Sequence, residues 1–436
     1  MHVLPQLREL KERYPDDVEV VGVHSGKFTG ERESAHIRDA SIRLDAIHPT
    51  LNDRQFRVWR SYAVNAWPTL VAVDPRGYVV GVRAGEYSAA DVVPFIDRVL
   101  AEARNAGTLR SGALHFTPDK PTIQPGQLAF PGKVVVDGRR IAIADSGHHR
   151  IFVGSLDDTG TRMHVNRILG GELPGYGDGS NPLFSNPQGL AFSGDLLYVA
   201  DAGNHCIRAV SLDTGATRTI AGIGRQAHTM HDLDIGAMSS PWDLALSGST
   251  LYVAMAGLHQ IFAVDVHTRR AVVHSGTGAE ELHDGTHAEA ALAQPMGICV
   301  AGNVLCFTDS ETSAVRTAAL DPGGRVRTIV GTDLFDFGDT DGMGDDVRLQ
   351  HPQGIALAPD GRLLVADSYN GALKWIDRER KSAETWLRGF HEPSGVSITD
   401  ERVYVADTNA HRIAAVQRST GAIDELRLLL PSASAP

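Results

Sequence analysis

Aspartate and histidine recur at fixed positions after residue 120, and both residue types can transfer protons or bind metals. An aspartate follows a proline by fourteen or fifteen residues in five places: Pro131/Asp145, Pro187/Asp201, Pro295/Asp309, Pro352/Asp367 and Pro393/Asp407. Met255 stands at the equivalent place in a further unit, and His149, His205 and His411 follow three of the aspartates. A residue that recurs at the same turn of every repeat more often fixes that turn than performs catalysis, because Asp accepts hydrogen bonds from nearby backbone donors. We therefore expect these residues to be structural.

The acidic segment 335–346, FDFGDTDGMGDD, is a second candidate, because hard cations prefer clustered carboxylates. The spacing of its aspartates does not match an EF-hand, and similar Asp-Gly pairs occur at 178–179 and 284–285. The mismatch favours a solvated acidic turn, with cation binding left as the alternative.

Three cysteines, Cys206, Cys299 and Cys306, could support thiol chemistry. None of them belongs to a Cys-x-x-Cys motif, and all three stand in segments predicted to be strands, where we expect small core residues. So few cysteines argue against a disulfide framework and favour a reducing, cytoplasmic location. The sequence therefore predicts no catalytic residue, no metal ligand and no cofactor.

The elements that carry the repeated aspartates are short apolar strands. Six units begin at FPGKVVV, NPQGLAF, SPWDLAL, QPMGICV, HPQGIAL and EPSGVSI, and each continues into a second strand such as LYVAD. Further strands follow, separated by turns rich in Gly, Asp and Asn. One four-stranded unit cannot bury its own faces, whereas six units packed in a ring can. The repeats predict an all-β, six-bladed β-propeller over residues 125–430.

Four connections between the units are long: Gly170–Asn186, Gly222–Ser240, Gly276–Gln294 and Gly331–His351. Long loops on a rigid scaffold commonly bind ligands, so we expect a protein or peptide partner on the face where these loops emerge. Either residues 113–118 or residues 422–430 can supply the outer strand that closes the ring, and the sequence does not decide between them.

Residues 1–106 show a different pattern, which is typical of an α/β domain. Pro68 directly precedes a strand and is a candidate for a cis peptide bond. The expected elements are a helix over 4–14, a buried strand over 18–23, a helix over 32–44, strands over 69–73 and 78–85, and a closing helix capped by Ser88.

Two families resemble these patterns. Trp67-Pro68-Thr69, with the order of elements around it, resembles the redoxin branch of the thioredoxin-like fold. The Pro-x-Gly…Tyr-Val-Ala-Asp…Asn-His-x-Ile pattern of residues 125–430 resembles NHL repeats. The first resemblance implies that Trp67, Pro68 and Thr69 face the substrate of a thiol–disulfide site.

That resemblance also places a Cys-x-x-Cys motif and a central strand before the first helix. Counted back from Pro5, the second cysteine of the motif would fall just before Met1. We therefore expect an incomplete thioredoxin-like domain, in which Met1 is either an internal methionine or the start of a degenerate copy. The lost strand would lie between residues 18–23 and 69–73.

The expected domains are the incomplete thioredoxin-like domain (1–106), a linker (107–124), the propeller (125–430) and a tail (431–436). Residues 1–110 hold equal numbers of basic and acidic residues, so the net charge of −12 belongs to the remainder. An acidic body repels phosphates, which argues against a nucleic-acid partner. No stretch is long and apolar enough to cross a membrane, which argues against a membrane partner.

Three functions are compatible with these observations. The resemblance implies the thiol–disulfide oxidoreductase type, with a propeller that binds a partner, although this chain lacks the redox cysteines. The alternative is a non-enzymatic binding scaffold. A metal-dependent propeller hydrolase or lyase is disfavoured, because the first strands of the units are almost wholly apolar and Asp243 is a lone exception.

Overall fold

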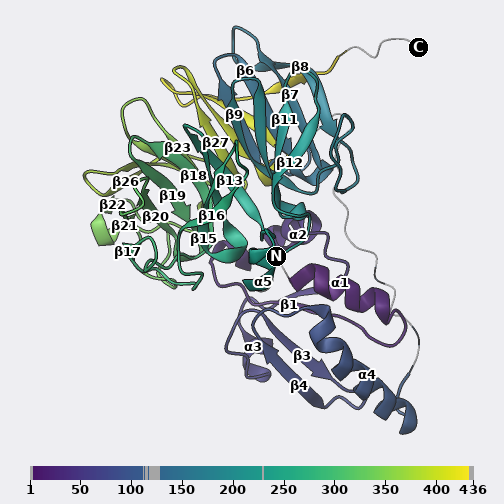
Figure 1. Ribbon diagram of the computed structural model, residues 1–436. Helices are drawn as coiled ribbons and strands as arrows, with labels where there is room; N and C mark the ends of the chain where they lie inside the picture. The colour runs from purple at the N-terminus through teal and green to yellow at the C-terminus, as the bar shows by residue number, and fades with distance from the viewer. Residues whose placement is uncertain (1–2, 111, 113–115, 117–127, 228–229, 432–436) are drawn as a thin grey trace. The chain divides into compact units, whose positions relative to one another are not determined.

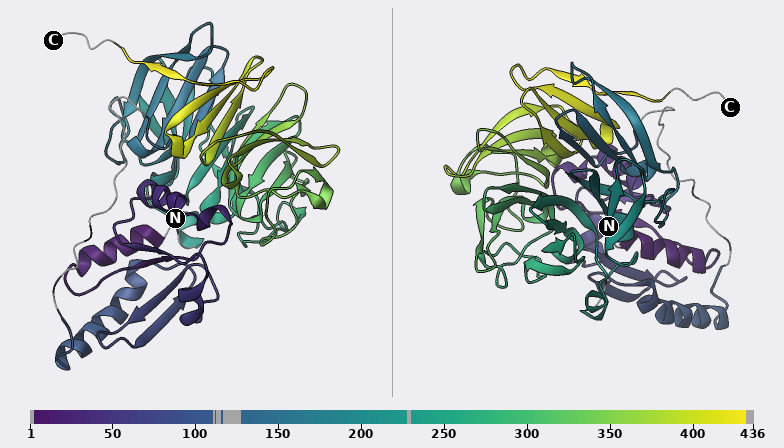
Figure 2. Two further views of the ribbon diagram at one scale, coloured as in Figure 1. Left: turned by 180° about the vertical axis from the view of Figure 1, so that it is seen from behind. Right: turned by 45° about the horizontal axis from the view of Figure 1, so that its top comes forward.

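The computed structural model describes residues 3–110, 112, 116, 128–227 and 230–431. The chain divides into two compact units, Met1–Thr122 and Ile123–Pro436. Helices and short strands make up the first unit, and strands make up nearly all of the second (Figures 1 and 2). An α/β unit is therefore followed by an all-β six-bladed propeller, which confirms the predicted fold class.

The first unit contains four helices and four short strands in its described part. The helices are α1 (Val3–Arg13), α2 (Ser34–Arg43), α3 (Arg57–Ser61) and α4 (Ala89–Asn105). The strands are β1 (Gly22–His24), β2 (Thr50–Asn52), β3 (Thr69–Val73) and β4 (Val79–Ala84). The predicted cap of α4 is confirmed: the Ser88 hydroxyl accepts from the Asp91 N–H, and the Asp91 carboxylate accepts from the Ser88 N–H.

The strands of the first unit form two separate pairs. β1 pairs in parallel with β2, and β3 pairs antiparallel with β4, with no pairing between β1 and β3 in the described residues. The prediction of a buried strand over 18–23 is wrong, because β1 covers only Gly22–His24. Val21, directly before β1, is 59% exposed, and Val23, within it, is 43% exposed. A strand that pairs on one side only leaves a row of its backbone N–H and C=O groups without a partner strand.

Blades 1 to 3 each form an antiparallel sheet of four consecutive strands. Blade 1 contains β5 (Lys133–Asp137), β6 (Arg140–Asp145), β7 (Arg150–Leu156) and β8 (Arg162–Gly170). Blade 2 contains β9 (Pro187–Ser193), β10 (Leu196–Asp201), β11 (Cys206–Ser211) and β12 (Thr217–Ala221). The short helix α5 (Met230–Asp234) precedes blade 3, which contains β13 (Pro241–Ser247), β14 (Thr250–Met255), β15 (Gln260–Asp265) and β16 (Ala271–Ser275).

Blades 4 and 5 each gain a fifth strand from the long loop that precedes them. Blade 4 contains β18 (Pro295–Ala301), β19 (Val304–Asp309), β20 (Ala314–Ala319) and β21 (Arg325–Val330), with β17 (Gly285–Thr286) on its outer edge. Blade 5 contains β23 (Pro352–Leu357), β24 (Leu363–Asp367), β25 (Ala372–Asp377) and β26 (Ser382–Arg388), with β22 (Gly342–Met343) outside them. Blade 6 contains β27 (Pro393–Ile398), β28 (Arg402–Asp407), β29 (Arg412–Gln417) and β30 (Ile423–Glu425).

The six first strands form a closed inner ring. Each of them contacts the first strand of the next blade, and β27 of blade 6 contacts β5 of blade 1. The core consists of six apolar clusters, one between each pair of neighbouring blades. Both faces of every blade are therefore buried, which explains why the strands are apolar runs.

The C-terminal segment closes the ring. β30 is the outermost strand of blade 6, and β31 (Arg427–Leu429) continues from it to pair in parallel with β8 of blade 1. Of the two closing segments that the sequence leaves open, residues 422–430 therefore supply the outer strand. The other candidate, 113–118, lies outside the described residues except for Phe116.

A fully buried aspartate holds the turn after the second strand in five of the six blades. Its carboxylate accepts a hydrogen bond from the backbone N–H that stands two residues before the proline of the same blade. The donor–acceptor distances lie between 2.5 and 2.8 Å for Ala129–Asp145, Ser185–Asp201, Ala293–Asp309, Gln350–Asp367 and His391–Asp407. This is the structural role expected for the repeated aspartates.

Each of these buried carboxylates also has a cationic partner on the third strand of its blade. The nitrogen–oxygen distances are 2.7 Å for Arg150–Asp145, Arg208–Asp201 and Arg316–Asp309, 2.8 Å for Arg412–Asp407 and 3.7 Å for Lys374–Asp367. In blade 3 the buried apolar residues Met255 and Phe262 stand at the positions that Asp309 and Arg316 occupy in blade 4. Because an unpaired buried charge is costly, the acid and the cation are present together or absent together.

The residue four positions after each repeated aspartate, or after Met255 in blade 3, connects neighbouring blades. It adopts a left-handed conformation with φ between 51° and 57° in every blade: His149, His205, His259, Ser313, Gly371 and His411. The imidazole Nδ1 of each histidine accepts from the backbone N–H that enters the next blade, at 3.0–3.1 Å. The His411–Phe130 bond joins blade 6 to blade 1, so the repeated histidines hold the ring together.

We predict that Asp309→Ala destabilises the propeller by about 3–5 kcal/mol, because it leaves Arg316 buried without its fully buried partner. The double change Asp309→Met with Arg316→Phe copies blade 3 and should recover most of this loss, since it removes both charges. The free energy of unfolding in urea measures both effects. A double variant no more stable than Asp309→Ala would contradict the assigned role of the pair.

Candidate functional site

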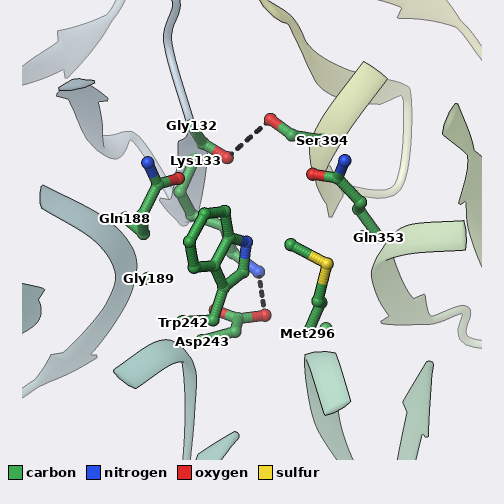
Figure 3. Close-up of a pocket in the computed structure, with 11 residues that line it drawn as sticks. Gly132, Lys133, Gln188, Gly189, Trp242, Asp243, Met296, Gln353 and Ser394 are labelled. Carbon is green, nitrogen blue, oxygen red and sulfur yellow. Dashed lines mark hydrogen bonds and ion pairs between the residues drawn. The ribbon is translucent and has the colours of Figure 1, made fainter. Parts of the chain in front are cut away.

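The first strands bring one residue from every blade to the mouth of the central channel. This residue directly follows the repeated proline, and together with its neighbour it lines a pocket of approximately 210 Å³, counted with its opening to solvent. The lining residues are Gly132, Lys133, Gln188, Gly189, Trp242, Asp243, Met296, Gly297, Gln353, Gly354 and Ser394. Figure 3 shows the indole of Trp242 and the thioether of Met296 directed into the pocket from neighbouring blades.

Close approach of the first strands explains the glycines around this mouth. A Cβ atom at Gly297 would lie 2.1 Å from the Gln353 carbonyl oxygen, and one at Gly354 would lie 2.3 Å from the Ser394 carbonyl oxygen. Glycine therefore stands two residues after the proline in four blades, because any side chain there would strike the next blade. Lys133 of blade 1 and Asp243 of blade 3 stand at this position in the remaining two.

These two exceptions form an ion pair across the channel. The Lys133 Nζ lies 2.6 Å from the Asp243 Oδ2, and both side chains are at least nine-tenths buried. The same carboxylate oxygen accepts from the Ile298 N–H, whereas the buried Asp243 Oδ1 has no partner among the described residues. A buried carboxylate oxygen without a donor is costly, so the site is suited to receive an N–H or O–H group.

Sequence analysis found Asp243 but missed the rest of this site. The other polar residues of the site lie one or two positions after the repeated proline: Lys133, Gln188 and Gln353. They are not among the apolar residues that indicated the strands. Their position relative to the repeated proline could have identified them, because the residues after that proline line the inner ring in all six blades. In the described residues, no group of three or more His, Cys, Asp or Glu side chains is placed to hold a metal ion.

Three of the five aspartates in the acidic segment 335–346 form ion pairs with cationic side chains of the protein itself. Asp339 and Asp341 lie 2.8 and 3.0 Å from the Nζ of the buried Lys374, and Asp336 lies 2.5 Å from Arg348. Burial raises the pKa of Asp341, but hydrogen bonds from Thr385 and Lys374 outweigh this and hold it below its ordinary value. The segment therefore supplies counter-charge to blade 5.

The two other Asp-Gly pairs repeat this arrangement. Asp178 pairs with the buried Arg208 at 2.8 Å, and Asp284 pairs with the buried Arg316 at 3.0 Å. Each of these loop aspartates also accepts from the backbone N–H of a threonine on the fourth strand of the blade. The long loops are thus fastened to the outer edges of blades 2, 4 and 5.

In the first unit, the residues singled out from the sequence surround an aromatic cluster. The Trp67–Pro68 peptide bond is cis, as the sequence suggested. Trp67 is 47% exposed, its indole N–H donates to the Ser25 carbonyl at 2.8 Å, and its ring lies 4.4 Å from that of Trp59. The Thr69 hydroxyl donates to the Ala66 carbonyl. Pro68 and Thr69 are half-buried whereas Trp67 is exposed, so Trp67 presents the largest surface of the three.

A buried aspartate that the sequence analysis did not single out positions this cluster. The Asp53 carboxylate accepts from the backbone N–H groups of Arg57, Val58 and Trp59 at 2.7–3.1 Å and from the Ser25 hydroxyl at 3.0 Å. Burial raises the pKa of Asp53, but these four hydrogen bonds outweigh it, so the pKa lies below its ordinary value. Asp53 therefore holds the start of α3 beside Trp67.

The three cysteines are free thiols and all lie in propeller strands. Cys206 and Cys306 are buried in β11 and β19, and Cys299 is partly exposed in β18. Residues 1–122 contain no cysteine, so the surface around Trp67 has no thiol of its own.

Comparison with known proteins places both units in families. The family described as Thioredoxin-like matches residues 1–79, and the NHL repeat matches residues 128–153, 184–209, 349–376 and 390–415. The matched repeats fall in blades 1, 2, 5 and 6. The chain therefore belongs to the class of proteins that join a thioredoxin-like unit to an NHL-repeat β-propeller.

Named relatives share this combination over nearly the whole chain. NHL repeat-containing protein 2 of Gallus gallus is 35% identical over 99% of this chain, which spans 66% of that protein's length. Protein SUPPRESSOR OF QUENCHING 1, chloroplastic, of Arabidopsis thaliana is 36% identical over 98% of this chain and 44% of its own length. Among solved structures, a nidogen/laminin complex matches 65% of this chain and 91% of its own chain at 18% identity, with a TM-score of 0.47. No described helix is long and apolar enough to cross a membrane.

We predict that Asp53→Asn destabilises the first unit by about 1–3 kcal/mol at neutral pH, because it replaces a charged hydrogen-bond acceptor. The folded-state pKa of Asp53 is lowered, so the stability that its charge contributes is present above the unfolded value of 3.8 and is lost as the pH falls below it. The melting difference between wild type and variant, followed by far-ultraviolet circular dichroism, should therefore shrink on acidification. A difference that stays constant down to acidic pH would contradict this assignment.

Proposed function

We propose that this chain is a non-enzymatic binding protein whose propeller receives a segment of a protein partner at the channel mouth. The observation that carries this proposal is the pocket itself, with its unpartnered Asp243 oxygen and the surrounding Trp242, Met296 and glutamines. Aromatic and Met side chains are enriched at protein interfaces, and Gln supplies hydrogen bonds to backbone.

A protein partner would contact both the channel mouth and the loops around it. An inserted side chain with an N–H group would satisfy Asp243. The long loops emerge on the same face, because each connects the end of a fourth strand to the proline that starts the next blade. They would provide the rest of the contact surface.

The thioredoxin-like unit supports a related but distinct proposal. Its family resemblance implies thiol–disulfide chemistry, with Trp67, Pro68 and Thr69 facing the substrate. We infer that the exposed Trp67 of this unit contributes to binding a partner. Three unpaired cysteines are consistent with a reducing compartment such as the cytoplasm.

Peptide selection with matched variants tests the propeller site. Peptides selected against the full chain from a displayed library should bind Trp242→Ala at least about tenfold more weakly, since buried aromatic anchors dominate such interfaces. Asn303→Ala, in the exposed turn at the opposite end of blade 4, is the matched control and should bind normally. Equal binding by wild type and Trp242→Ala would refute the channel mouth as the site.

An insulin-reduction assay tests the absence of thiol-exchange activity. We expect the purified chain to show no turnover above a variant in which all three cysteines are replaced by serine. Reduction of insulin that disappears in this variant would show that the propeller cysteines catalyse exchange, and the non-enzymatic proposal would fail.

A further inference from the structure

Two of the three cysteines face each other within blade 4. Cys299 of β18 and Cys306 of β19 are directly paired in the antiparallel register, and each thiol shifts the pKa of the other. Facing residues of antiparallel strands have Cα atoms about 4.5–5.5 Å apart, which lies inside the range of about 4.4–6.8 Å that disulfides span. The backbone therefore already holds the two thiols at a separation that a disulfide can bridge.

An arginine from the neighbouring blade approaches this pair. The Arg378 Nη1, in the turn after β25 of blade 5, lies 4.0 Å from the Cys306 Sγ. The Arg378 Nε is buried and has no partner in the described part of the chain. A guanidinium with an unused donor beside a sulfur is the environment that stabilises a thiolate.

The two thiols differ in their readiness to ionise. The hydrogen bond from Cys299 lowers the pKa of Cys306, burial opposes this, and the charge of Arg378 lowers it further. The hydrogen bond to Cys306 and burial both raise the pKa of Cys299. Cys306 is thus the thiol that ionises more readily, and Cys299 is the one that more readily keeps its proton.

Cys206 provides the contrast within the same chain. It occupies a buried strand position in blade 2, no second cysteine stands near it in the sequence of its blade, and burial raises its pKa well above the ordinary value. Burial in a propeller strand therefore does not by itself make a reactive thiol. The Arg208 guanidinium near Cys206 lowers the pKa of that thiol, but burial and the charge of Asp201 outweigh it, so the feature special to blade 4 is the facing cysteine.

We propose that Cys299 and Cys306 form a peroxide-reactive dithiol that closes to a disulfide within blade 4. The Cys306 thiolate attacks one oxygen of hydrogen peroxide, the O–O bond breaks, and a sulfenic acid and hydroxide form. The Cys299 sulfur then attacks the sulfenic sulfur, and the S–O bond breaks. The Cys299 proton leaves with the sulfenic oxygen as one water, and the hydroxide takes up the proton that Cys306 released on ionising, which gives the second. Two thiols and one peroxide therefore give one disulfide and two waters.

The position of the two cysteines allows hydrogen peroxide to reach them and places their oxidation at the boundary between blades 4 and 5. Cys299 is partly exposed, and hydrogen peroxide is small enough to reach the pair from that side. Cys306 belongs to the apolar cluster between blades 4 and 5, which also contains Ile355 and Val365. Disulfide formation would remove the thiolate that Arg378 contacts and so alter this boundary between blades.

Thiol mapping of the full chain tests the proposal. After treatment with hydrogen peroxide and blocking of free thiols, mass spectrometry should find a peptide pair joined through Cys299 and Cys306, with Cys206 still free. Dithiothreitol should restore both thiols. Oxidation should be at least about tenfold faster at Cys306 than at Cys206, because thiolate fraction sets the rate.

Matched variants separate this reaction from general oxidation. Cys299→Ala should leave a sulfenic acid on Cys306 that dimedone traps. Arg378→Met should slow the reaction, because it removes the charge that favours the Cys306 thiolate, and Cys206→Ala should change nothing. Melting temperatures check that each variant is folded. Oxidation of Cys206 as fast as Cys306 in the folded protein, or modification of both blade 4 thiols without a bond between them, would overturn the proposal.

Discussion

The propeller depends on a carboxylate buried at the turn between the second and third strands of a blade. This group accepts a hydrogen bond from the backbone that leads into the first strand of the same blade, so it ties the inner strand to the middle of the sheet. Removing a charge from water is costly, and the structure offsets the cost with a cation on the third strand. Blade 3 shows that the cost is real, because the loss of the acid at Met255 accompanies the loss of the cation at Phe262.

The long loops and the channel mouth are consequences of this arrangement. In blades 2, 4 and 5 the buried cation needs further acceptors, and a loop aspartate supplies them, which fastens the loop to the edge of the blade. In blades 1, 2, 3 and 6 a histidine then joins the blade to the next one through a backbone N–H. A ring fixed in this way brings its first strands so close that glycine is required at most positions of the inner ring. Lys133 and Asp243 occupy this inner-ring position in the two blades that have no glycine there.

Much of the fold could be predicted from the sequence because the signals were repeated or chemically specific. The spacing of proline and aspartate predicted six blades, and Ser88 predicted the start of α4. The short elements β2 and α3 escaped prediction, since three to five residues carry no detectable period. The burial of residues 18–23 was overestimated, because an apolar sequence does not reveal whether a neighbouring strand covers it.

The candidate site was harder to predict for the same physical reason. Its residues come from six strands that are distant in the sequence, and each contributes only one or two side chains. The partners of the acidic loop were equally hidden, because Lys374 stands more than thirty positions after Asp339 in the sequence. The pairing of Cys299 with Cys306 required the strand register, which a spacing of seven residues does not provide alone.

Native-state hydrogen exchange of the full chain tests the role of the buried carboxylates most directly. The account predicts that the N–H groups of Ala129, Ser185, Ala293, Gln350 and His391 exchange only when the propeller unfolds globally, as slowly as the amides of the second strands. Exchange of these five amides as fast as the exposed loop residues 279–281 would show that the carboxylates do not hold the turns, and the account would be wrong.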